Sequence, residues 1–492
     1  MSAYKQVLDH ALQIRTLESV CELISWDQET LMPPAANEHR TAQKVLLSRI
    51  AHDKRVDPAF FGHLESLLHA FDEDSDEAII VNRIHRDIEK ARRLPADFVE
   101  EMARATSTGI EAWQQARERN EWKLFLPHLE SIISLSRKKA DFLGYKDHPY
   151  DALLDEYDPG MTTAKIGSFF SSLKPKLIFL LDEIRKTPFF KTNYKTFSSS
   201  HHDQFAACKD LLTRIGVDWD RARMDTSAHP FSTSPHPTDS RFTIRRTSDD
   251  LLNQVMAALH EAGHTMYDLG LQQRHYGTPL AEPASLSIHE SQSRFWETLI
   301  GKSKIFVPHI FSTLSQNISG TLPYKNEEDL YEQLNLVACT PIRIEADEVT
   351  YPLHVILRFE IEKELLEGTL APKELPERWN AGMQELLGIT PKNDQEGCLQ
   401  DVHWSFGLVG YFPTYTLGSL FSVCWFSAMK KDLPHLDELI KKGTFAPICS
   451  WLQEHVWNHG RRFFSYDLVA RSLGREPTED DYISYLREKY VG

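Results

Sequence analysis

The chain has 492 residues, and its composition of 41% hydrophobic, 26% charged and 11% aromatic residues is typical of a folded protein and excludes a disordered one. The formal net charge of −16 opposes the phosphate neutralisation on which non-specific nucleic-acid binding depends, so it argues against a nucleic-acid partner. At about 150 residues per domain the length suits roughly three domains, although one large helical enzyme also accounts for it.

The N-terminal segment and the cysteines both point to a reducing compartment. The first twenty residues carry Lys5, Asp9, Arg15 and Glu18, where a signal peptide needs an unbroken apolar stretch. The six cysteines are scattered along the chain and include no CxxC pair, which disfavours a secreted disulfide framework. These features predict a cytoplasmic protein.

Helical periodicity dominates the chain from its start. Apolar residues between Tyr4 and Ile24 predict one amphipathic helix, or a pair of helices, that ends near the break at Met32, Pro33 and Pro34. The same period predicts further helices over residues 38–52, 76–93, 96–119, 121–143, 162–185, 202–215, 249–270, 283–300, 327–338, 350–367, 372–387, 417–430, 434–441, 444–457 and 478–490.

Strand signals are few. The segment from Ser240 to Arg246 alternates between polar and apolar residues and predicts a short strand, whereas the polar stretch from His229 to Thr238 resembles a surface loop. The sequence shows no internal repeat and no low-complexity linker. It therefore predicts a mostly α fold with at most one small β-sheet, organised as a single domain over residues 1–492.

One long segment contains no charged residue and raises the question of a membrane span. Residues 402–429 include no Asp, Glu, Lys or Arg, and a spanning helix needs about 20 mostly apolar residues. However, Gly407, Gly410, Pro413 and Gly418 interrupt the run, and polar residues fill its first half. We expect this segment to line a buried cleft and not to cross a membrane.

The strongest chemical signal is the HEAGH motif, His260 to His264, inside a predicted helix. Two histidines four residues apart lie one turn apart on the same helical face, so both rings can reach one Zn²⁺. Glu261 between them is placed to act on a water at the metal, which predicts a general base. Chance is the alternative explanation, because HExxH also occurs in unrelated chains.

A third ligand is predicted at Glu290, which lies 26 residues beyond His264 in a second helical stretch. This gap allows a turn and an antiparallel helix that returns a carboxylate to the metal, which gives a His₂Glu site with one open position. The neighbouring His289 is a rival ligand, although it points about 100° away around the helix. Gln292 and Arg294 are candidates for orienting the site, or are ordinary polar residues of a helix.

Several motifs, in order along nearly the whole chain, resemble the thermostable carboxypeptidase family of zinc metallocarboxypeptidases. They are SWDQETLMPP (Ser25 to Pro34), HPF (His229 to Phe231), DSRFT (Asp239 to Thr243), HEAGH (His260 to His264), HESQSR (His289 to Arg294), IRIEAD (Ile342 to Asp347) followed by EVTYPLH, and GCLQDVHW (Gly397 to Trp404) followed by GYFPTYTLG (Gly410 to Gly418).

The resemblance implies a cation that recognises the terminal carboxylate of a peptide. Arg343 of the IRIEAD motif is the first candidate, because a guanidinium can hold a carboxylate with two hydrogen bonds, and Arg241 of DSRFT is the second. The alternative for Arg343 is a structural ion pair with Glu345 or Asp347. Asp239 is a candidate carboxylate behind a ligand histidine.

Donors for a developing oxyanion are predicted in the charge-free segment. His403, Tyr411 and Tyr415 can donate hydrogen bonds in a low-dielectric cleft, although each is also compatible with ordinary burial in a core. Asp401 is predicted either to hold His403 in the required tautomer or to cap a helix.

The resemblance as a whole implies a large helical, single-domain metallopeptidase with a deep substrate groove. It implies one Zn²⁺ per chain, with another divalent ion such as Co²⁺ also suited to these ligands, and release of single C-terminal residues from peptides with broad specificity. It also implies a homodimer, with no nucleic-acid and no membrane partner.

Two other functions remain open at this point. A related helical HExxH enzyme could act as an endopeptidase or remove dipeptides, and only Arg343 and its neighbours argue for removal of one residue. A non-catalytic role in which zinc joins helices is disfavoured, because structural zinc sites are usually closed and rich in cysteine.

Overall fold

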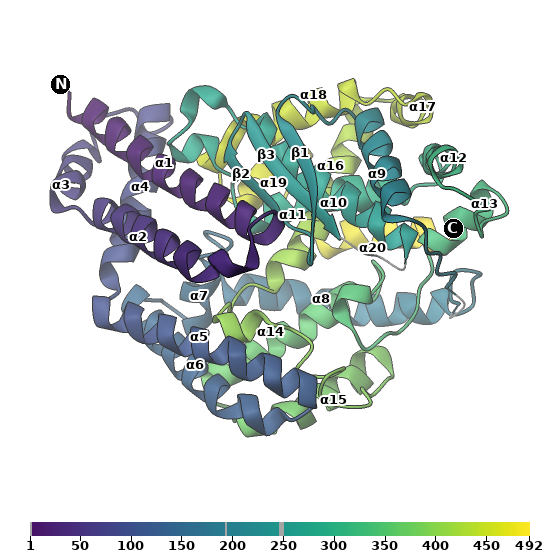
Figure 1. Ribbon diagram of the computed structural model, residues 1–492, viewed down its shortest axis with the longest axis horizontal. Helices are drawn as coiled ribbons and strands as arrows, with labels where there is room; N and C mark the ends of the chain where they lie inside the picture. Colours follow the sequence, from purple (N-terminus) through teal and green to yellow (C-terminus); the bar gives the residue numbers. More distant parts are fainter. Residues whose placement is uncertain (1, 192–193, 246–249) are drawn as a thin grey trace. The chain divides into compact units, whose positions relative to one another are not determined.

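The computed structural model describes residues 2–191, 194–245 and 250–492. Its contacts group the chain into two compact units (Figure 1). The described parts of residues 1–92, 195–334 and 425–475 form the first unit, and those of residues 93–194, 335–424 and 476–492 form the second. The mostly α fold is confirmed, whereas a single domain over residues 1–492 stays a prediction.

The first unit contains the N-terminal helices, a three-stranded sheet and the helices that carry the HEAGH and HESQSR motifs. Its elements are α1 (Ala3–Thr30), α2 (Asn37–Arg55), α3 (Pro58–Leu67), α4 (Asp76–Arg93), α9 (His201–Ile215), β1 (Ala222–Ser227), β2 (Ser232–His236), β3 (Asp239–Arg245), α10 (Leu251–Gly270), α11 (Leu286–Arg294), α12 (Val307–Asn317), α13 (Glu327–Leu334), α17 (Leu436–Lys442), α18 (Ala446–His455) and α19 (Ser465–Leu473).

The second unit is helical, and its helices are α5 (Ala96–Arg119), α6 (Trp122–Leu143), α7 (Pro149–Leu154), α8 (Thr163–Ile184), α14 (Tyr351–Glu367), α15 (Leu375–Leu387) and α20 (Glu479–Tyr490). The remaining long helix, α16 (Pro413–Asp432), contributes residues to both units. Short helices that the sequence analysis missed are α3, α7, α12 and α19. They span 6 to 11 residues, too few to display a clear apolar period.

The N-terminal helices bury the apolar stripe expected from the sequence. Val7 and Ala11 on α1 pack in one core with Phe60 of α3 and Ile84 of α4. Helix α1 runs unbroken from Ala3 to Thr30, so the first segment is one helix and not a pair.

The sheet has the strand order β1-β3-β2, with β1 parallel and β2 antiparallel to the central strand β3 (Figure 1). The predicted strand corresponds to β3, and its last predicted residue, Arg246, lies outside the described residues. The prediction of a loop from His229 to Thr238 is wrong, because β2 lies inside this stretch and Ser232 pairs with Phe242 of β3. Tertiary pairing, rather than an apolar pattern, makes this polar segment a strand.

The start of helix α10 is capped by a side chain that binds the amides of the first turn. The Asp250 carboxylate accepts hydrogen bonds from the amides of Leu252 and Asn253, as a capping residue does. The helix was predicted from residue 249, which lies outside the described residues. Most of α10 is buried against β2, β3 and α11, so the sheet and the second helix hold it in place.

Helix α11 is capped by Ser285, whose hydroxyl accepts a hydrogen bond from the Ile288 amide. After Arg294 the chain continues as a wider π-helical turn over Phe295–Gly301. Such turns are rare in proteins, and those that occur are often found at functional sites.

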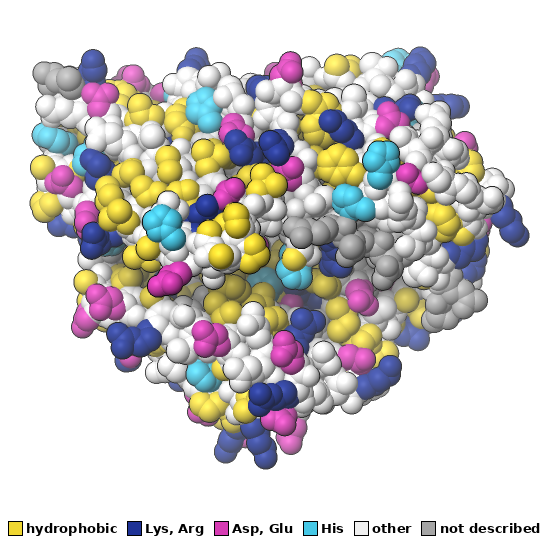
Figure 2. Space-filling view, viewed as in Figure 1, with side chains coloured by type: hydrophobic (Ala, Val, Ile, Leu, Met, Phe, Trp, Pro, Cys, Tyr) yellow, Lys and Arg dark blue, Asp and Glu magenta, His cyan; other side chains and the backbone are white. Residues whose placement is uncertain are grey.

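Within the described residues, no helix is both long enough and apolar enough to cross a membrane. On the face shown in Figure 2, acidic and basic side chains are interspersed. Hydrophobic side chains gather on the left of this view, in the region of α1 and α2, where Val45 and Leu46 are exposed.

Candidate active site

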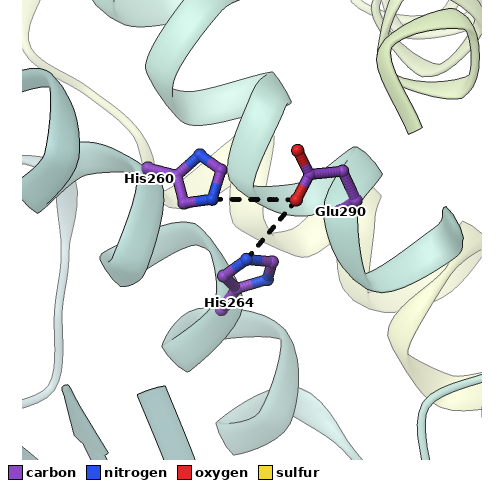
Figure 3. A group of neighbouring side chains, drawn as sticks. All are labelled: His260, His264 and Glu290. Carbon is purple, nitrogen blue, oxygen red and sulfur yellow. Dashed lines mark ion pairs between the residues drawn. The ribbon is translucent and has the colours of Figure 1, made fainter. Parts of the chain in front are cut away.

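Three predicted ligands converge at one point of the first unit. His260 and His264 project from successive turns of α10, and both rings face the Glu290 side chain on α11 (Figure 3). The Glu290 Oε2 atom lies 3.7 Å from Nε2 of His260 and 3.7 Å from Nε2 of His264. Metal bonds of about 2.1 Å at tetrahedral angles would separate ligand atoms by about 3.4 Å, so the three residues fit one Zn²⁺.

A glycine allows the two helices to approach this closely. A Cβ atom at Gly263 would lie 2.5 Å from the Gln292 carbonyl oxygen and 2.6 Å from the Ser293 Cα atom. Both distances are shorter than any normal contact, so a larger residue in the middle of HEAGH would push α11 away. The glycine therefore matters for bringing Glu290 to the histidines.

The pKa values of the two histidines are shifted in opposite directions. Burial lowers the pKa of His264 well below its ordinary value, which keeps the ring neutral with a lone pair free for a metal. Burial also acts on His260, but Glu290 and Glu297 outweigh it and raise the pKa of this ring to about 9. The negative field that holds a proton on His260 also attracts a metal cation.

Glu261 is buried beside the three predicted ligands and is not part of the cluster that they form. Burial raises the pKa of its carboxyl group to about 7, and the charge of His260 and a hydrogen bond with Ser232 of β2 oppose this rise only in part. A carboxyl group that titrates near neutral pH suits a general base.

The sequence analysis missed a residue that contacts His260 at Nδ1, the ring nitrogen that is not directed at Glu290. Glu297, in the π-helical turn, has its Oε2 atom 2.9 Å from Nδ1 of His260. Arg294 connects this carboxylate to the ligand, because it donates from Nε to Glu290 at 2.9 Å and from Nη1 to Glu297 at 3.2 Å. On a regular α-helix a spacing of seven residues would place Glu290 and Glu297 on nearly the same face, and this signal could have revealed Glu297.

His289, the rival ligand, has a different partner. Its Nε2 atom lies 3.1 Å from Oδ1 of Asp268, and its ring stacks on that of His264 with centroids 4.2 Å apart and planes inclined by 11°. Asp268 also accepts a hydrogen bond from the Ser234 hydroxyl of β2 at 2.6 Å. This geometry favours Glu290 as the third ligand.

The other candidates of the first unit, which were predicted near the metal or, for Arg241, near the substrate carboxylate, have partners of their own. Asp239 and Arg241 on β3 form a bidentate pair, with distances of 2.7 and 2.8 Å. Gln292 is fully buried, and its side-chain oxygen accepts a hydrogen bond from Nε1 of Trp457 at 2.9 Å. Gln292 therefore supports the packing behind α11.

Apart from Arg241, the residues predicted to contact substrate lie in the second unit, where they form a group around Asp401. Arg343 is buried and donates to Oδ1 of Asp401 from Nε at 3.0 Å and from Nη2 at 2.8 Å. Arg358, which is fully buried, donates to the other oxygen at 2.6 Å. Asp401, and neither Glu345 nor Asp347, is therefore the carboxylate partner of Arg343 in this structure.

This group carries more positive than negative charge. Burial opposes ionisation of Asp401, but the two guanidinium groups outweigh it and hold the pKa of this carboxyl group below its ordinary value. Burial also lowers the pKa of Arg358, to about 10. Two arginines share one carboxylate, which leaves one positive charge in excess among the three side chains.

His403, Tyr411 and Tyr415 lie together beside this group. Nε2 of His403 is 3.1 Å from the Tyr415 hydroxyl, and the His403 ring contacts that of Tyr411 with centroids 5.4 Å apart. Burial lowers the pKa of His403 to about 4, so the ring is neutral at pH 7. Its Nδ1 atom lies 3.9 Å from Asp401, too far for the hydrogen bond that was expected to set its tautomer.

A model of the Carboxypeptidase Taq (M32) metallopeptidase family matches residues 6–490 of the chain. The chain belongs to this family. The resemblance found from the motifs is thereby confirmed, and this M32 metallopeptidase is a metallocarboxypeptidase, a hydrolase that acts on peptides.

Named relatives match the M32 chain over its whole length. Thermostable carboxypeptidase 1 of Pyrococcus furiosus is 36% identical over 495 residues, which cover 99% of this chain and 98% of that protein. The protein of the same name from Thermus thermophilus is 36% identical over 505 residues, which cover 100% and 98%.

Solved structures of similar proteins share the fold. A structure of the Pyrococcus furiosus carboxypeptidase matches with a TM-score of 0.95 at 36% identity and covers 100% of this chain and 99% of that one. Metallocarboxypeptidase 1 of Trypanosoma cruzi matches with a TM-score of 0.94 at 30% identity and the same coverage.

Proposed function

We propose that this metallopeptidase is zinc-dependent and removes single residues from the C-terminus of peptides with broad side-chain specificity. One observation carries the proposal: two imidazole nitrogens and one carboxylate oxygen converge, and a buried carboxyl group with a pKa near 7 lies beside them. Co²⁺ would suit the same ligands, but a tetrahedral His₂Glu set favours Zn²⁺.

In the proposed mechanism His260, His264 and Glu290 hold the metal. A bound Zn²⁺ would supply Lewis acidity for the scissile carbonyl and for the attacking water. Glu261 takes a proton from this water and passes it to the leaving amine, so hydrolysis needs no acyl-enzyme. Burial keeps the pKa of the Glu261 carboxyl group near neutral pH, so this group can both accept and donate a proton.

Recognition of the substrate is assigned mainly to residues of the second unit. We propose that Arg343 holds the terminal carboxylate, with Arg241 as the second candidate, and that His403, Tyr411 and Tyr415 donate hydrogen bonds to the developing oxyanion. The excess positive charge around Asp401 supports this assignment, because a bound carboxylate would neutralise it.

The experiment that tests this function compares a peptide acid with its C-terminal amide. We expect mass spectrometry to show the acid shortened one residue at a time, while the amide persists. Peptides that differ only in the last residue should be trimmed at rates within about tenfold of each other, and metal analysis should find one zinc per chain. Equal cleavage of acid and amide would indicate an endopeptidase, and a ladder of two-residue steps would indicate a peptidyl-dipeptidase.

We further propose a homodimer in the cytoplasm. None of the six cysteines, which all lie within the described residues, forms a disulfide, as a reducing compartment favours. Exposed apolar residues such as Val45 and Leu46 offer a surface for a second copy. Sedimentation equilibrium should give twice the chain mass of 56.7 kDa, and Val45→Glu should shift the protein toward the monomer. A single-chain mass for the wild type would refute the dimer.

A further inference from the structure

One helical segment carries a proposed metal ligand with a carboxylate side chain, followed by a guanidinium group and a second carboxylate. These are Glu290, Arg294 and Glu297, and their side chains are 9%, 17% and 14% exposed. We propose that Arg294 and Glu297 form a positioning relay that orients His260 and Glu290 for the metal. This inference rests on the proposed function, because it requires these two residues to be ligands.

The first part of the relay acts on His260. Its ring has Nε2 directed toward Glu290 and Nδ1 at 2.9 Å from Oε2 of Glu297. A carboxylate can only accept hydrogen bonds, so this contact places the ring proton on Nδ1. In the neutral ring that a metal binds, Nε2 then offers its lone pair to the metal, and the ring cannot rotate without breaking the bond to Glu297.

The second part acts on Glu290. Arg294 donates from Nε to Oε1 of Glu290 at 2.9 Å, and the Ser293 hydroxyl lies 3.2 Å from Oε2. Because Oε1 is engaged by the arginine, Oε2 is the oxygen that remains directed at both histidines. The relay therefore selects which carboxylate oxygen is offered to the metal.

Arg294 couples the two parts because it binds both carboxylates at once. Its Nη1 atom donates to Oε2 of Glu297 at 3.2 Å, the same oxygen that faces His260. Glu297 is therefore held between the guanidinium group of Arg294 and the ring of His260. Loss of either neighbour should weaken the contact with the other.

The widened turn explains how Glu297 reaches this position. Arg294 is the last residue of α11, and the π-helical turn starts at Phe295, between the two relay residues. The second ligand histidine is held differently, since the ring of His289 stacks on His264 and is itself bound by Asp268. Loss of the relay should therefore act through His260 and Glu290 and leave the packing around His264 in place.

The test measures zinc affinity without any substrate, by competition with a chromophoric chelator. Glu297→Ala and Arg294→Ala should each weaken zinc binding by about 10- to 100-fold, the range found for residues that orient metal ligands. Glu297→Gln keeps an acceptor for the Nδ1 proton and should lose less affinity than Glu297→Ala. The double alanine variant should lose less than the product of the single losses, because the two residues act together.

A matched control is Glu282→Ala. Glu282 also accepts a hydrogen bond from a partly buried arginine of the same unit, Arg461, at 2.8 Å. This variant should bind zinc as the wild type does. Thermal unfolding of each metal-free variant should show that the relay residues affect metal affinity beyond any loss of stability; if Glu297→Ala does not fold, Glu297→Gln and Arg294→Ala carry the comparison.

The outcomes separate the relay from the proposed function. Zinc affinity in Glu297→Ala equal to that of a zinc-binding wild type would overturn the relay alone, as would an equal loss of affinity in Glu282→Ala. A wild-type chain that binds no zinc would overturn the proposed function and the relay with it.

Discussion

Two groups of buried charged side chains, one in each unit, differ in how they offset the free-energy cost of burying charge. Around Asp401, two guanidinium groups donate to the two oxygens of one carboxylate, so opposite charges meet directly. Around Glu290, a carboxylate oxygen lies 3.7 Å from each of two imidazole nitrogens, and these three atoms converge at one point. We call the group around Glu290, which is suited to a cation from outside, the first group, and the group around Asp401, which is stabilised within the chain, the second group.

The difference indicates what each group is for. A site that binds a metal must present lone pairs that the protein leaves available, and its rigidity must come from residues behind the ligands. A group whose charges already match contributes mainly to the fold. The single positive charge in excess around Asp401 is the feature that lets its arginines also serve a substrate carboxylate, as proposed above.

Removal of a metal ligand should break the first group completely. Glu290→Ala takes away one of three donors, so we expect zinc binding to weaken by more than about a hundredfold, beyond the range for residues behind the ligands, and peptidase activity to disappear. Metal analysis after dialysis and a peptide ladder measure both effects. His289→Ala should keep its zinc, and a loaded, active Glu290→Ala would instead identify His289 or another donor as the third ligand.

Replacement of the base should separate metal from chemistry. Glu261→Gln preserves the shape of the side chain and all three ligands, but it removes the proton acceptor, so turnover should fall by at least about a hundredfold while zinc content stays at one per chain. Steady-state kinetics and metal analysis on the same sample test this. Loss of zinc in this variant would mean that Glu261 is a ligand, and the assigned roles would be wrong.

Removal of the shared carboxylate should break the second group. Asp401→Ala leaves the guanidinium groups of Arg343 and Arg358 buried without a counter-ion, which should lower the free energy of unfolding by about 3–5 kcal/mol. Urea unfolding measures this change. Glu345→Ala, at an exposed carboxylate close in sequence to Arg343, should stay within about 0.5 kcal/mol of the wild type.

The same variant has an expected pH dependence. The pKa of Asp401 is lower in the folded chain than its unfolded value of about 3.9, so its stabilising contribution is present above that pH and is lost as the pH falls below it. The stability difference between wild type and Asp401→Ala should therefore be constant from about pH 5 to pH 8 and shrink below about pH 4. A difference that shrinks toward alkaline pH would contradict this assignment.

Arg343→Ala tests whether the second group also serves the substrate. If Arg343 holds the terminal carboxylate, its loss removes a contact of about 1.5–3 kcal/mol, which is roughly a tenfold to hundredfold loss in kcat/KM for a peptide acid. Discrimination between acid and amide should shrink, and zinc content should not change. Unaltered discrimination would remove Arg343 from the site and direct attention to Arg241→Ala.

Local patterns predicted much of this molecule. The helical period located most long helices, because an amphipathic helix buries one stripe wherever it packs, and α1 shows this stripe at Val7 and Ala11. The two histidines of HEAGH had to share a helical face because residues four apart lie one turn apart on a helix. Glu290 was within reach of sequence reasoning because a turn and a second helix fit between it and His264.

Tertiary structure decided the features that depend on contacts between distant segments. Strand β2 exists because its polar residues pair with β3, and no local apolar pattern announces such pairing. Asp401 binds arginines 58 and 43 positions earlier in the chain, where the sequence suggested a nearby histidine or a helix end. Glu297 approaches His260 through a π-helical turn, and Gly263 matters because α11 comes close to it. A local pattern specifies which face of a helix is apolar or polar, but the partner of a buried charge is set by the packing of the whole unit.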